Sequence, residues 1–573
     1  MNFETVYSNE ELKDEILNIV NENKDLYNVL EDYNHYEYHY CLNYLRENLF
    51  LWYPFKKEGS LLEIGAGCGQ FTNLFCDKVN NVVSVESDEK LHKILSKRCT
   101  SDNLTVLKND FSDIKTDEKF DYIVLCDIFE YAKQFYGSAN SYADYLSYLK
   151  TFLKDDGIIL LAISNRLGLK YFAGFREEIT GKYFMGIDDF PNVDFAQTFS
   201  KTELEDLIKS CGFTNYKFFY PYPDHRFPDV INTDEFVNEI PYSRLPVYYD
   251  SRVRFFRENK TNQTLAHDNI SQYFSNSFLV EIRNDDNKRQ TDDLKYIKLS
   301  SNRNENFRTI TSIHQDGDKL NVTKSPTSSL SVNHLKNMHE ATEYEFGKIK
   351  FLENDFDGEN FTYPFIEDNN LESYLIDAII ANDRDEFFRL LDYFYNSLFY
   401  KSYTSTEYAT DEFLKVFGTK SDIKFHCHDV TNFDLIFNNM FIIDNELVTI
   451  DYEWFFKFPI PLEYVFYRVI RHHYVTNPLF KDFTSIEEIF DYFVLDIENI
   501  ELFKQWELHF AFQYVYTNLI RPDVSNVSKK YVDMLDDIEF IYKDRLRMKY
   551  SHSWKITKPL RKVISLIKGR SDE

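Results

Sequence analysis

Three residue types that shape turns and cross-links are scarce in this sequence. Of its 573 residues, 16 are glycine, 14 are proline and 7 are cysteine. The cysteines are odd in number and scattered, and they include no C-x-x-C pair. This excludes a disulfide framework and a zinc ribbon, and it indicates a reducing compartment. Because glycine is so rare here, a glycine cluster is more informative than it would be in an average protein.

Basic residues and long apolar runs are also in short supply. Lys and Arg number 65 against 94 Asp and Glu, a net charge of −29. We therefore expect no nucleic-acid partner, since a phosphate backbone requires a basic face. The longest clean apolar run, at 157–163, is too short to span a bilayer, and the polar, acidic N-terminal segment does not resemble a signal peptide. We expect a cytoplasmic protein.

The length predicts two or three domains, and 43% hydrophobic residues suffice to bury their cores. Residues 1–60 repeat apolar positions every three or four residues, which predicts a helical lead-in. Over 61–228, short β-rich runs alternate with helical stretches, which predicts an α/β fold with βαβ units around a parallel sheet. Residues 229–289 are irregular and polar, and we expect a linker there. Three strands and then helices fill 290–540, and 541–573 form a basic tail.

Three of the scarce glycines, Gly65, Gly67 and Gly69, stand at alternate positions. They follow an apolar strand that ends at Glu63–Ile64 and precede a predicted helix. A strand-to-helix turn without Cβ atoms lets a ligand approach the backbone N–H groups at a helix N-terminus. The spacing is GxGxG rather than GxGxxG, which weakens a dinucleotide-binding interpretation.

Acidic residues end the next two predicted strands. Glu86 stands where a carboxylate can hold two ribose hydroxyls, and Asp110 beside Phe111 suits an adenine amino group and its ring face. The glycine motif, Glu86 and Asp110–Phe111 each follow one of three successive predicted strands. Together they favour a nucleoside cofactor at this edge of the sheet.

The segments LLEIGAGCGQ, VVSVES, KNDF and FDYIVLCDIFEYA make residues 35–228 resemble class I S-adenosylmethionine (SAM)-dependent methyltransferases. The resemblance implies a Rossmann-like seven-stranded domain, with the glycine motif from Glu63 along the amino-acid part of SAM, Glu86 at the ribose, and Asp110 and Phe111 at the adenine. It also implies that Asp127, after the fourth strand, faces the methyl acceptor. No NPPY motif follows that strand, which argues against amide methylation. Four cations could surround an anionic acceptor: Arg166, Lys170, Arg176 and Lys182.

A second constellation lies in the C-terminal half. Asp434 and Asn439 have the D-x-x-x-x-N spacing of a kinase catalytic loop, and Asp451 follows a predicted strand pair. Lys324 lies on the third strand of an upstream meander, and the helix after it bears Glu340. The order of these motifs makes residues 290–540 resemble aminoglycoside-phosphotransferase-type kinases.

That resemblance implies a bilobal, protein-kinase-like α+β domain using ATP and Mg²⁺. Asp434 would be catalytic, Asn439 and Asp451 would bind magnesium, and Lys324 would pair with phosphate and with Glu340. Two alternatives stay open: Glu343 in place of Glu340, and His428–Asp429 as the catalytic pair. The hairpin SNRNEN (301–306) has no glycine, so backbone clamping of phosphates is in doubt.

The tail carries ten basic residues against one acid between Lys543 and Arg570, interleaved with apolar side chains. A basic amphipathic segment of this kind favours an anionic membrane surface, here the inner face of the plasma membrane. The alternatives are a solvated tail or a contact with an acidic partner.

The order of methyltransferase, kinase-like domain and tail resembles the bifunctional bacterial enzymes that cap O-antigen-type polysaccharides. That resemblance implies a glycan or sugar acceptor, free or lipid-linked, that is phosphorylated and then methylated on the phosphate. Two other interpretations stay open. One is a SAM-dependent O-methyltransferase of a sugar or small molecule with an inert second domain, and the other is a nucleotide-sensing scaffold.

Overall fold

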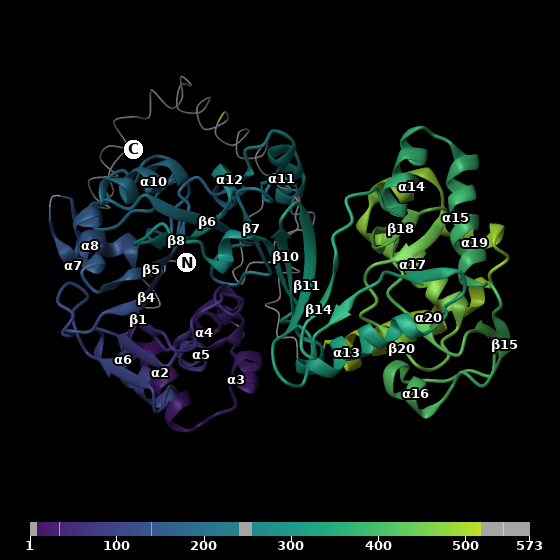
Figure 1. The fold of residues 1–573 in the computed structure, drawn as a ribbon, viewed down its shortest axis with the longest axis horizontal. Helices are drawn as coiled ribbons and strands as arrows, with labels where there is room; N and C mark the ends of the chain where they lie inside the picture. Colours follow the sequence, from purple (N-terminus) through teal and green to yellow (C-terminus); the bar gives the residue numbers. More distant parts are fainter. Residues whose placement is uncertain (1–8, 34, 139, 240–254, 517–542, 544–573) are drawn as a thin grey trace, which may run out of the picture.

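The computed structural model describes residues 9–33, 35–138, 140–239, 255–516 and 543. Figure 1 shows two parts side by side, an N-terminal α/β part and a largely helical C-terminal part, joined by long strands. The basic tail predicted for 541–573 lies outside the described residues except for Lys543. Within the part of the chain that the structure describes, no helix is long and apolar enough to cross a membrane.

Short helices precede the sheet: α2 (Glu10–Asn21), α3 (Leu26–Asp32), α4 (Tyr36–Leu42) and the 3₁₀-helix η1 (Tyr44–Leu49). Helix α2 begins at its N-cap Asn9, whose side chain accepts from two backbone N–H groups of the first turn. Its buried residues recur at helical spacing and pack with Leu91 and Ile94 of α6 (Glu89–Arg98). The lead-in is thereby fixed to the α/β part through α6.

Seven strands form the N-terminal sheet in the order β3-β2-β1-β4-β5-β8-β6. Their bounds are β1 (Ser60–Ile64), β2 (Asn81–Val85), β3 (Leu104–Leu107), β4 (Phe120–Cys126), β5 (Leu153–Ser164), β6 (Asn215–Tyr222) and β8 (Ser277–Arg283). Strands β1 to β5 pair in parallel, and β8 runs antiparallel between β5 and β6. Because side chains alternate along a strand, Leu61 and Leu62 enter different cores on the two faces of the sheet. This is the α/β, Rossmann-like arrangement that the alternating runs predict.

The segment that was expected to form a linker and to contain the domain boundary is part of the fold. Residues 229–289, predicted as a linker, supply β7 (Val230–Thr233), α11 (Glu258–His267), α12 (Ser271–Phe274) and β8. Every residue of β8 is buried in the middle of the sheet. The sequence did not reveal this strand, because its partners lie far away in the chain and polar residues flank it.

The sheet does not stop at the end of the α/β part. Strand β7 pairs with β9 (Leu294–Leu299), and the sheet continues through β10 (Thr309–Asp316), β11 (Lys319–Pro326), β14 (Phe361–Pro364) and β13 (Asp355–Phe356). One 13-stranded sheet therefore runs through both halves (Figure 1). Helix α13 (Val332–Glu340) follows the predicted three-strand meander β9–β10–β11.

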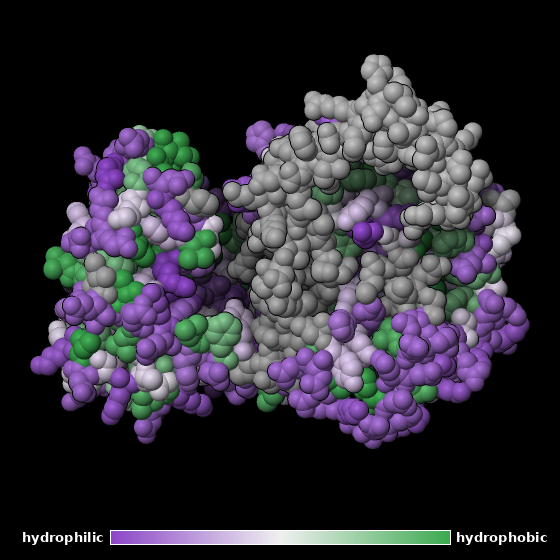
Figure 2. Space-filling view, turned by 180° about the vertical axis from the view of Figure 1, so that it is seen from behind, coloured by the Kyte–Doolittle hydropathy of each residue, from purple (hydrophilic) through white to green (hydrophobic). Residues whose placement is uncertain are grey.

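The C-terminal part is mostly helical and has its own aromatic-rich core. Its main helices are α14 (Leu371–Ile380), α15 (Arg384–Leu398), α16 (Asp411–Phe417), α17 (Leu462–Thr476) and α20 (Ile500–His509). A small sheet pairs β12 (Ile349–Phe351) with the hairpin β18 (Met440–Ile443) and β19 (Glu446–Thr449). Asp444 and Asn445 make the predicted turn of that hairpin with positive φ. Figure 2 shows a largely hydrophilic surface over this part, with scattered apolar patches.

Candidate active sites

The glycine motif forms the turn between β1 and α5 (Thr72–Lys78). Gly65, Gly67 and Gly69 all have positive φ, at 74°, 55° and 76°. A Cβ atom on Gly69 would lie 2.8 Å from the Cys99 sulfur, and one on Gly65 would lie 3.1 Å from the Ile128 side chain. Both the backbone conformation and the close packing therefore require glycine here.

Glu86, at the end of β2, lies across this turn. Its Oε2 accepts from the Gly67 N–H at 2.8 Å, and its Oε1 accepts from the Asp88 N–H at 2.9 Å. Burial raises the pKa of Glu86 to about 7. The sequence prediction that Glu86 and the glycines come together at one edge of the sheet agrees with this geometry.

Glu63 occupies a different position from the one expected. Its carboxylate is buried below the turn, where Oε2 accepts from the Thr72 hydroxyl at 2.7 Å and the Ser84 hydroxyl at 2.6 Å. Burial raises the pKa of Glu63 to about 7. Because it joins the start of α5 to β2, Glu63 positions the turn rather than facing a cofactor.

Asp110 and Phe111, the two residues predicted at the adenine, differ in their exposure. Asp110 is exposed after β3, and its side chain accepts from the Ser112 N–H at 3.0 Å and hydroxyl at 2.7 Å. Phe111 is 9% exposed and packs edge-on against Phe135 in the core. Asp110 is therefore accessible to a ligand, whereas most of the Phe111 ring is committed to packing.

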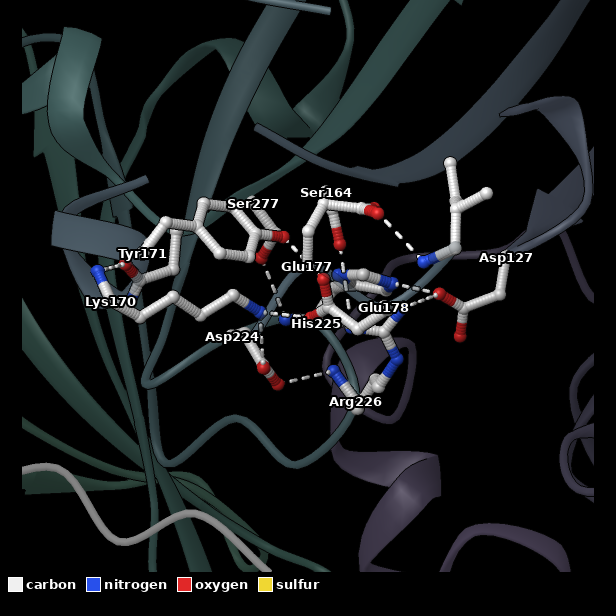
Figure 3. Close-up of polar contacts among 12 residues, drawn as sticks. Asp127, Ser164, Lys170, Tyr171, Glu177, Glu178, Asp224, His225, Arg226 and Ser277 are labelled. Atoms are coloured by element: carbon white, nitrogen blue, oxygen red, sulfur yellow. Dashed lines mark hydrogen bonds and ion pairs between the residues drawn. The ribbon is translucent and has the colours of Figure 1, made fainter. Parts of the chain in front are cut away.

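Asp127, predicted to face the acceptor as a catalytic residue, is a buried anion held by cations. Its Oδ1 lies 2.5 Å from Arg226 Nη2 and 2.6 Å from His225 Nε2, and its Oδ2 lies 3.4 Å from Arg46 Nη2 (Figure 3 shows the Arg226 side). The Tyr40 hydroxyl also donates to Oδ2, at 3.1 Å. Burial alone would raise the pKa of Asp127, but Arg226, His225 and Arg46 hold it well below its usual range. Asp127 is thus a positioning residue and not a proton acceptor.

The ion-pair network continues away from Asp127. Lys170 Nζ, completely buried, lies 2.6 Å from Glu178 Oε1 and 3.0 Å from Asp224 Oδ2, and Arg226 Nη1 lies 3.0 Å from the same Glu178 oxygen. Figure 3 shows the Lys170 and Arg226 side chains approaching these carboxylates from two directions. Buried charges of both signs satisfy one another here, as burial requires.

Of the four cations predicted around an anionic acceptor, only Lys170 belongs to this network among the described contacts. Arg166 pairs instead with Asp189 and Glu203, and Arg176 lies over the Tyr183 ring. Lys182 stands in a turn, where its backbone carbonyl accepts from Glu177.

The buried cations that contact Asp127 are Arg46 and Arg226, which sequence reasoning missed. They lie 81 and 99 residues from Asp127 in the chain. Arg46 lies in the predicted helical lead-in, and no sequence pattern linked it to Asp127.

A metal ion does not fit beside Asp127. Cys126, Asp127 and His225 present ligand atoms close enough for one. However, Arg46 and Arg226 already contact the same carboxylate, and two guanidinium groups repel a further cation.

Comparison with known proteins bears on this half of the chain. Residues 33–217 match the family model described as methyltransferase domain. An "uncharacterized methyltransferase" of Staphylococcus carnosus (strain TM300) is 29% identical over 150 residues, which are 26% of this chain and 66% of that protein. The chain thus spans slightly less than two thirds of that relative. Residues 33–217 are thus similar to methyltransferase domains.

Two solved structures are also similar to the chain. A SAM-dependent methyltransferase of Thermotoga maritima, described as a possible histamine N-methyltransferase, is 18% identical with a TM-score of 0.27, over 45% of this chain and 98% of that one. The phosphoethanolamine N-methyltransferase 1 of Haemonchus contortus is 14% identical with a TM-score of 0.27, over 49% of this chain and 52% of that one. At these scores the assignment of the methyltransferase domain depends on the family model and the sequence relative.

The second constellation surrounds Lys324 on β11. Lys324 Nζ lies 3.0 Å from Asp451 Oδ1 and also pairs with Glu453, and it is 3% exposed. Burial would lower the pKa of Lys324, but Asp451 and Glu453 raise it well above its usual range. The structure thus brings Lys324 of β11 together with Asp451 in the segment after β19.

Asp434 completes a group of three acids. Ligand oxygens of Asp434, Asp451 and Glu453 all lie within 4.8 Å of one another. Burial and the neighbouring Asp451 raise the pKa of Asp434 to about 7, and Arg468 Nη1 lies 3.8 Å from its Oδ1. Such a pKa suits a group that takes a proton near neutral pH.

Asn439 ends the 3₁₀-helix η6 (Phe437–Asn439). Its backbone oxygen accepts from the Ile450 N–H at 3.0 Å, which places it beside the strand that leads into Asp451.

The expected pairing of Lys324 with Glu340 is wrong. Glu340, the last residue of α13, pairs with Lys457 and lies 3.6 Å from Lys336, while Glu343 is exposed. Lys324 instead meets Glu453, two residues after Asp451. Glu340 ends α13 beside Lys457 and Lys336. Lys324 is therefore neutralised by Asp451 and Glu453, which follow β19.

The alternative catalytic pair, His428 and Asp429, lies elsewhere. His428 Nε2 is 2.8 Å from the Leu398 carbonyl oxygen, and the exposed Asp429 accepts from the Tyr403 hydroxyl at 2.9 Å. Neither residue belongs to the acidic group around Lys324. The geometry favours Asp434.

Proposed function

We propose that this protein is a bifunctional transferase that phosphorylates and methylates a cell-surface polysaccharide or its precursor. The observation that carries the proposal is the group Lys324, Asp451 and Asp434, which lies against the sheet that also holds the methyltransferase site. Lys324 contacts Asp451 and Glu453, and Asp434 lies close to both acids. This group offers a cation for phosphate and carboxylates for a metal ion and an acceptor hydroxyl, which phosphoryl transfer uses.

For methyl transfer, the glycine turn would hold the amino-acid part of SAM, Glu86 the ribose and Asp110 the adenine. The left-handed turn and the accessible Asp110 fit such a ligand. Bound SAM supplies an electrophilic methyl group. The chain itself must align the acceptor with that group and exclude water.

For phosphoryl transfer, Asp434 would orient the acceptor hydroxyl and take its proton. Asp451 and Asn439 would hold Mg²⁺, and Lys324 would contact a phosphate of ATP. The nucleotide supplies the phosphoryl group. Asp434 lies close to Asp451, so acceptor and metal would meet at one point.

The ionised, fully paired state of Asp127 supports methylation of a phosphate. An ionised phosphate oxygen needs no base to attack a methyl group, and Asp127 is itself locked between Arg226, His225 and Arg46. Arg46 and Arg226 are already paired with Asp127 and Glu178, so an anionic acceptor would compete with these carboxylates for a guanidinium group.

A second candidate function is direct methylation of a sugar hydroxyl, with an inert C-terminal half. One observation favours it. Nδ1 of the buried His225 has no hydrogen-bond partner among the described residues, while Nε2 faces Asp127. Burial lowers the pKa of His225, and a neutral ring that donates to Asp127 through Nε2 leaves Nδ1 able to accept a hydroxyl proton.

The test measures ATP and SAM turnover with a panel of sugar phosphates and the matching free sugars. For the two-step function we expect Asp434→Ala to abolish ATP use and to leave methylation of sugar phosphates. Glu86→Ala should abolish methylation alone, whereas Glu89→Ala, an exposed acid on α6, should change neither. Methylation of free sugars that depends on His225 would support the second candidate. If Asp434→Ala changes neither ATP use nor methylation, the two-step function is wrong.

The tail would bring the enzyme to an anionic membrane that presents a lipid-linked acceptor. Flotation with vesicles that contain anionic lipid tests this, by comparison of the full chain with a chain ending at Phe540. Equal flotation of the two would refute the role of the tail.

A further inference from the structure

The loop between β9 and β10 brings one side chain into the second site. This loop, residues 300–308, contains no glycine. Its Arg303 pairs with Glu453 and is 17% exposed. The guanidinium carbon also lies 5.5 Å from the centre of the Trp454 ring. Arg303 is therefore held facing the acids of the site and not the solvent.

Glu453 is clasped by two cations from different elements. Its Oε1 contacts Lys324, and its Oε2 contacts Arg303. Lys324 also contacts Asp451. A carboxylate with each oxygen on a different cation occupies the kind of position that two phosphate oxygens would take, because Arg and Lys bind carboxylate and phosphate oxygens with similar geometry.

The loop that bears Arg303 is fixed from several sides. The Asn304 N–H donates to the Val515 carbonyl at 2.7 Å, and Arg308 Nε donates to the Arg303 carbonyl at 2.8 Å. On the opposite side, the Ser301 hydroxyl donates to Asn48 of η1 at 2.6 Å. The arginine is thus preorganised by contacts at both ends of the loop, without the backbone freedom of glycine.

We propose that Arg303 is a phosphate-binding residue of the second site and takes the place of a glycine-rich phosphate loop. It would contact the terminal phosphates of a nucleoside triphosphate together with Lys324. Glu453 contacts both cations in the structure, and the phosphates would compete with it for Arg303 and Lys324. This inference rests on the proposed phosphotransferase function. It supplies a side chain that binds phosphate where the loop has no glycine for backbone contacts.

The test measures binding of ATP, ADP and adenosine by calorimetry, with Mg²⁺ present and the full chain. Charge-assisted hydrogen bonds from a fork-shaped guanidinium contribute about 1.5–3 kcal/mol, so we expect Arg303→Ala to weaken ATP binding by about ten- to a hundredfold. Adenosine binding should be unchanged. Arg303→Lys should recover part of the loss, because it restores the charge but not the fork.

Arg389→Ala is the matched control. Arg389 is an exposed arginine of α15 that pairs with Glu386, outside the site. We expect its nucleotide affinities to equal those of the unchanged protein. Retained SAM binding shows that each variant is folded.

Three results would overturn the inference. ATP binding by Arg303→Ala as tight as that of the unchanged protein would show that Arg303 does not contact phosphate. An equal loss for adenosine and ATP would show that Arg303 only supports the fold. If the unchanged protein binds no nucleotide, the phosphotransferase function fails, and the inference fails with it.

Discussion

The Ser301 hydroxyl donates a hydrogen bond to Asn48 Oδ1 at 2.6 Å, although the two residues lie 253 positions apart in the chain. This contact joins the lead-in of the methyltransferase domain to a loop of the C-terminal half. The lead-in helix η1 also carries Arg46, which contacts Asp127, and the loop carries Arg303, which contacts Glu453. Asp127 and Glu453 are therefore connected through η1, the hydrogen bond between Asn48 and Ser301, and the loop that carries Arg303.

The first prediction concerns separation of the two halves. A chain that ends at residue 289 loses β9, the partner of β7, and the loop that contacts Asn48. It therefore exposes an unpaired sheet edge, and we expect it to self-associate and to unfold at lower denaturant concentration than the full chain. Light scattering and urea unfolding measure this. A monomeric fragment as stable as the full chain would contradict the continuous sheet.

The second prediction concerns the buried anion Asp127. Asp127→Asn leaves the buried Arg226 and Arg46 without their negative partner, and removal of one member of a buried ion pair costs about 3–5 kcal/mol. We expect a loss of this size in the free energy of unfolding, measured with urea. Asp110→Asn, at an exposed strand end, is the control and should leave stability unchanged while it weakens SAM binding. A fully stable Asp127→Asn protein would show that the network contributes little.

The third prediction concerns the pH dependence of stability through Glu63. Its pKa is about 7 in the folded protein, against about 4.3 for an exposed glutamate. At Glu63 the folded state therefore binds more protons than the unfolded state between these values, so the contribution of Glu63 to stability falls as pH rises from about 4.3 to 7. Glu63→Gln removes this contribution, so its unfolding free energy should fall less over the same range. Parallel pH profiles of the two proteins would refute the raised pKa.

The fourth prediction concerns Asp434, the proposed proton acceptor of the second site. Burial and Asp451 raise the pKa of Asp434 to about 7, and Mg²⁺ held by Asp451 would lower it again, so the ionised fraction of Asp434 should grow with pH through a midpoint below that value. Phosphotransfer should accelerate accordingly and then level off. Asp434→Asn should reduce the rate at least a hundredfold, as loss of a general base typically costs about 10²–10⁴-fold. Asp429→Asn should keep both rate and profile, and the reverse result would favour the His428–Asp429 pair.

Local patterns located the parts of both sites that lie near strand ends. The ends of β1 and β2 meet because neighbouring parallel strands end at one edge, so the glycine turn and Glu86 could be placed from spacing alone. Lys324 and Asp451 were likewise found from motif order. The sequence did not identify Glu453 as the partner of Lys324. The choice between Glu340 and Glu453 depends on the direction in which α13 presents its last residue.

The sequence by itself determined the alternation of strands and helices, the glycine turn and the acids that follow β2 and β3. These features arise from interactions between residues close in the chain, which local periodicity reports. Only the tertiary structure decided that β8 enters the middle of the sheet, that β7 and β9 join the halves, and that Arg46 and Arg226 neutralise Asp127. Each of these depends on segments distant in sequence, and their pairing is selected by burial and charge balance in the whole fold, which no local pattern records.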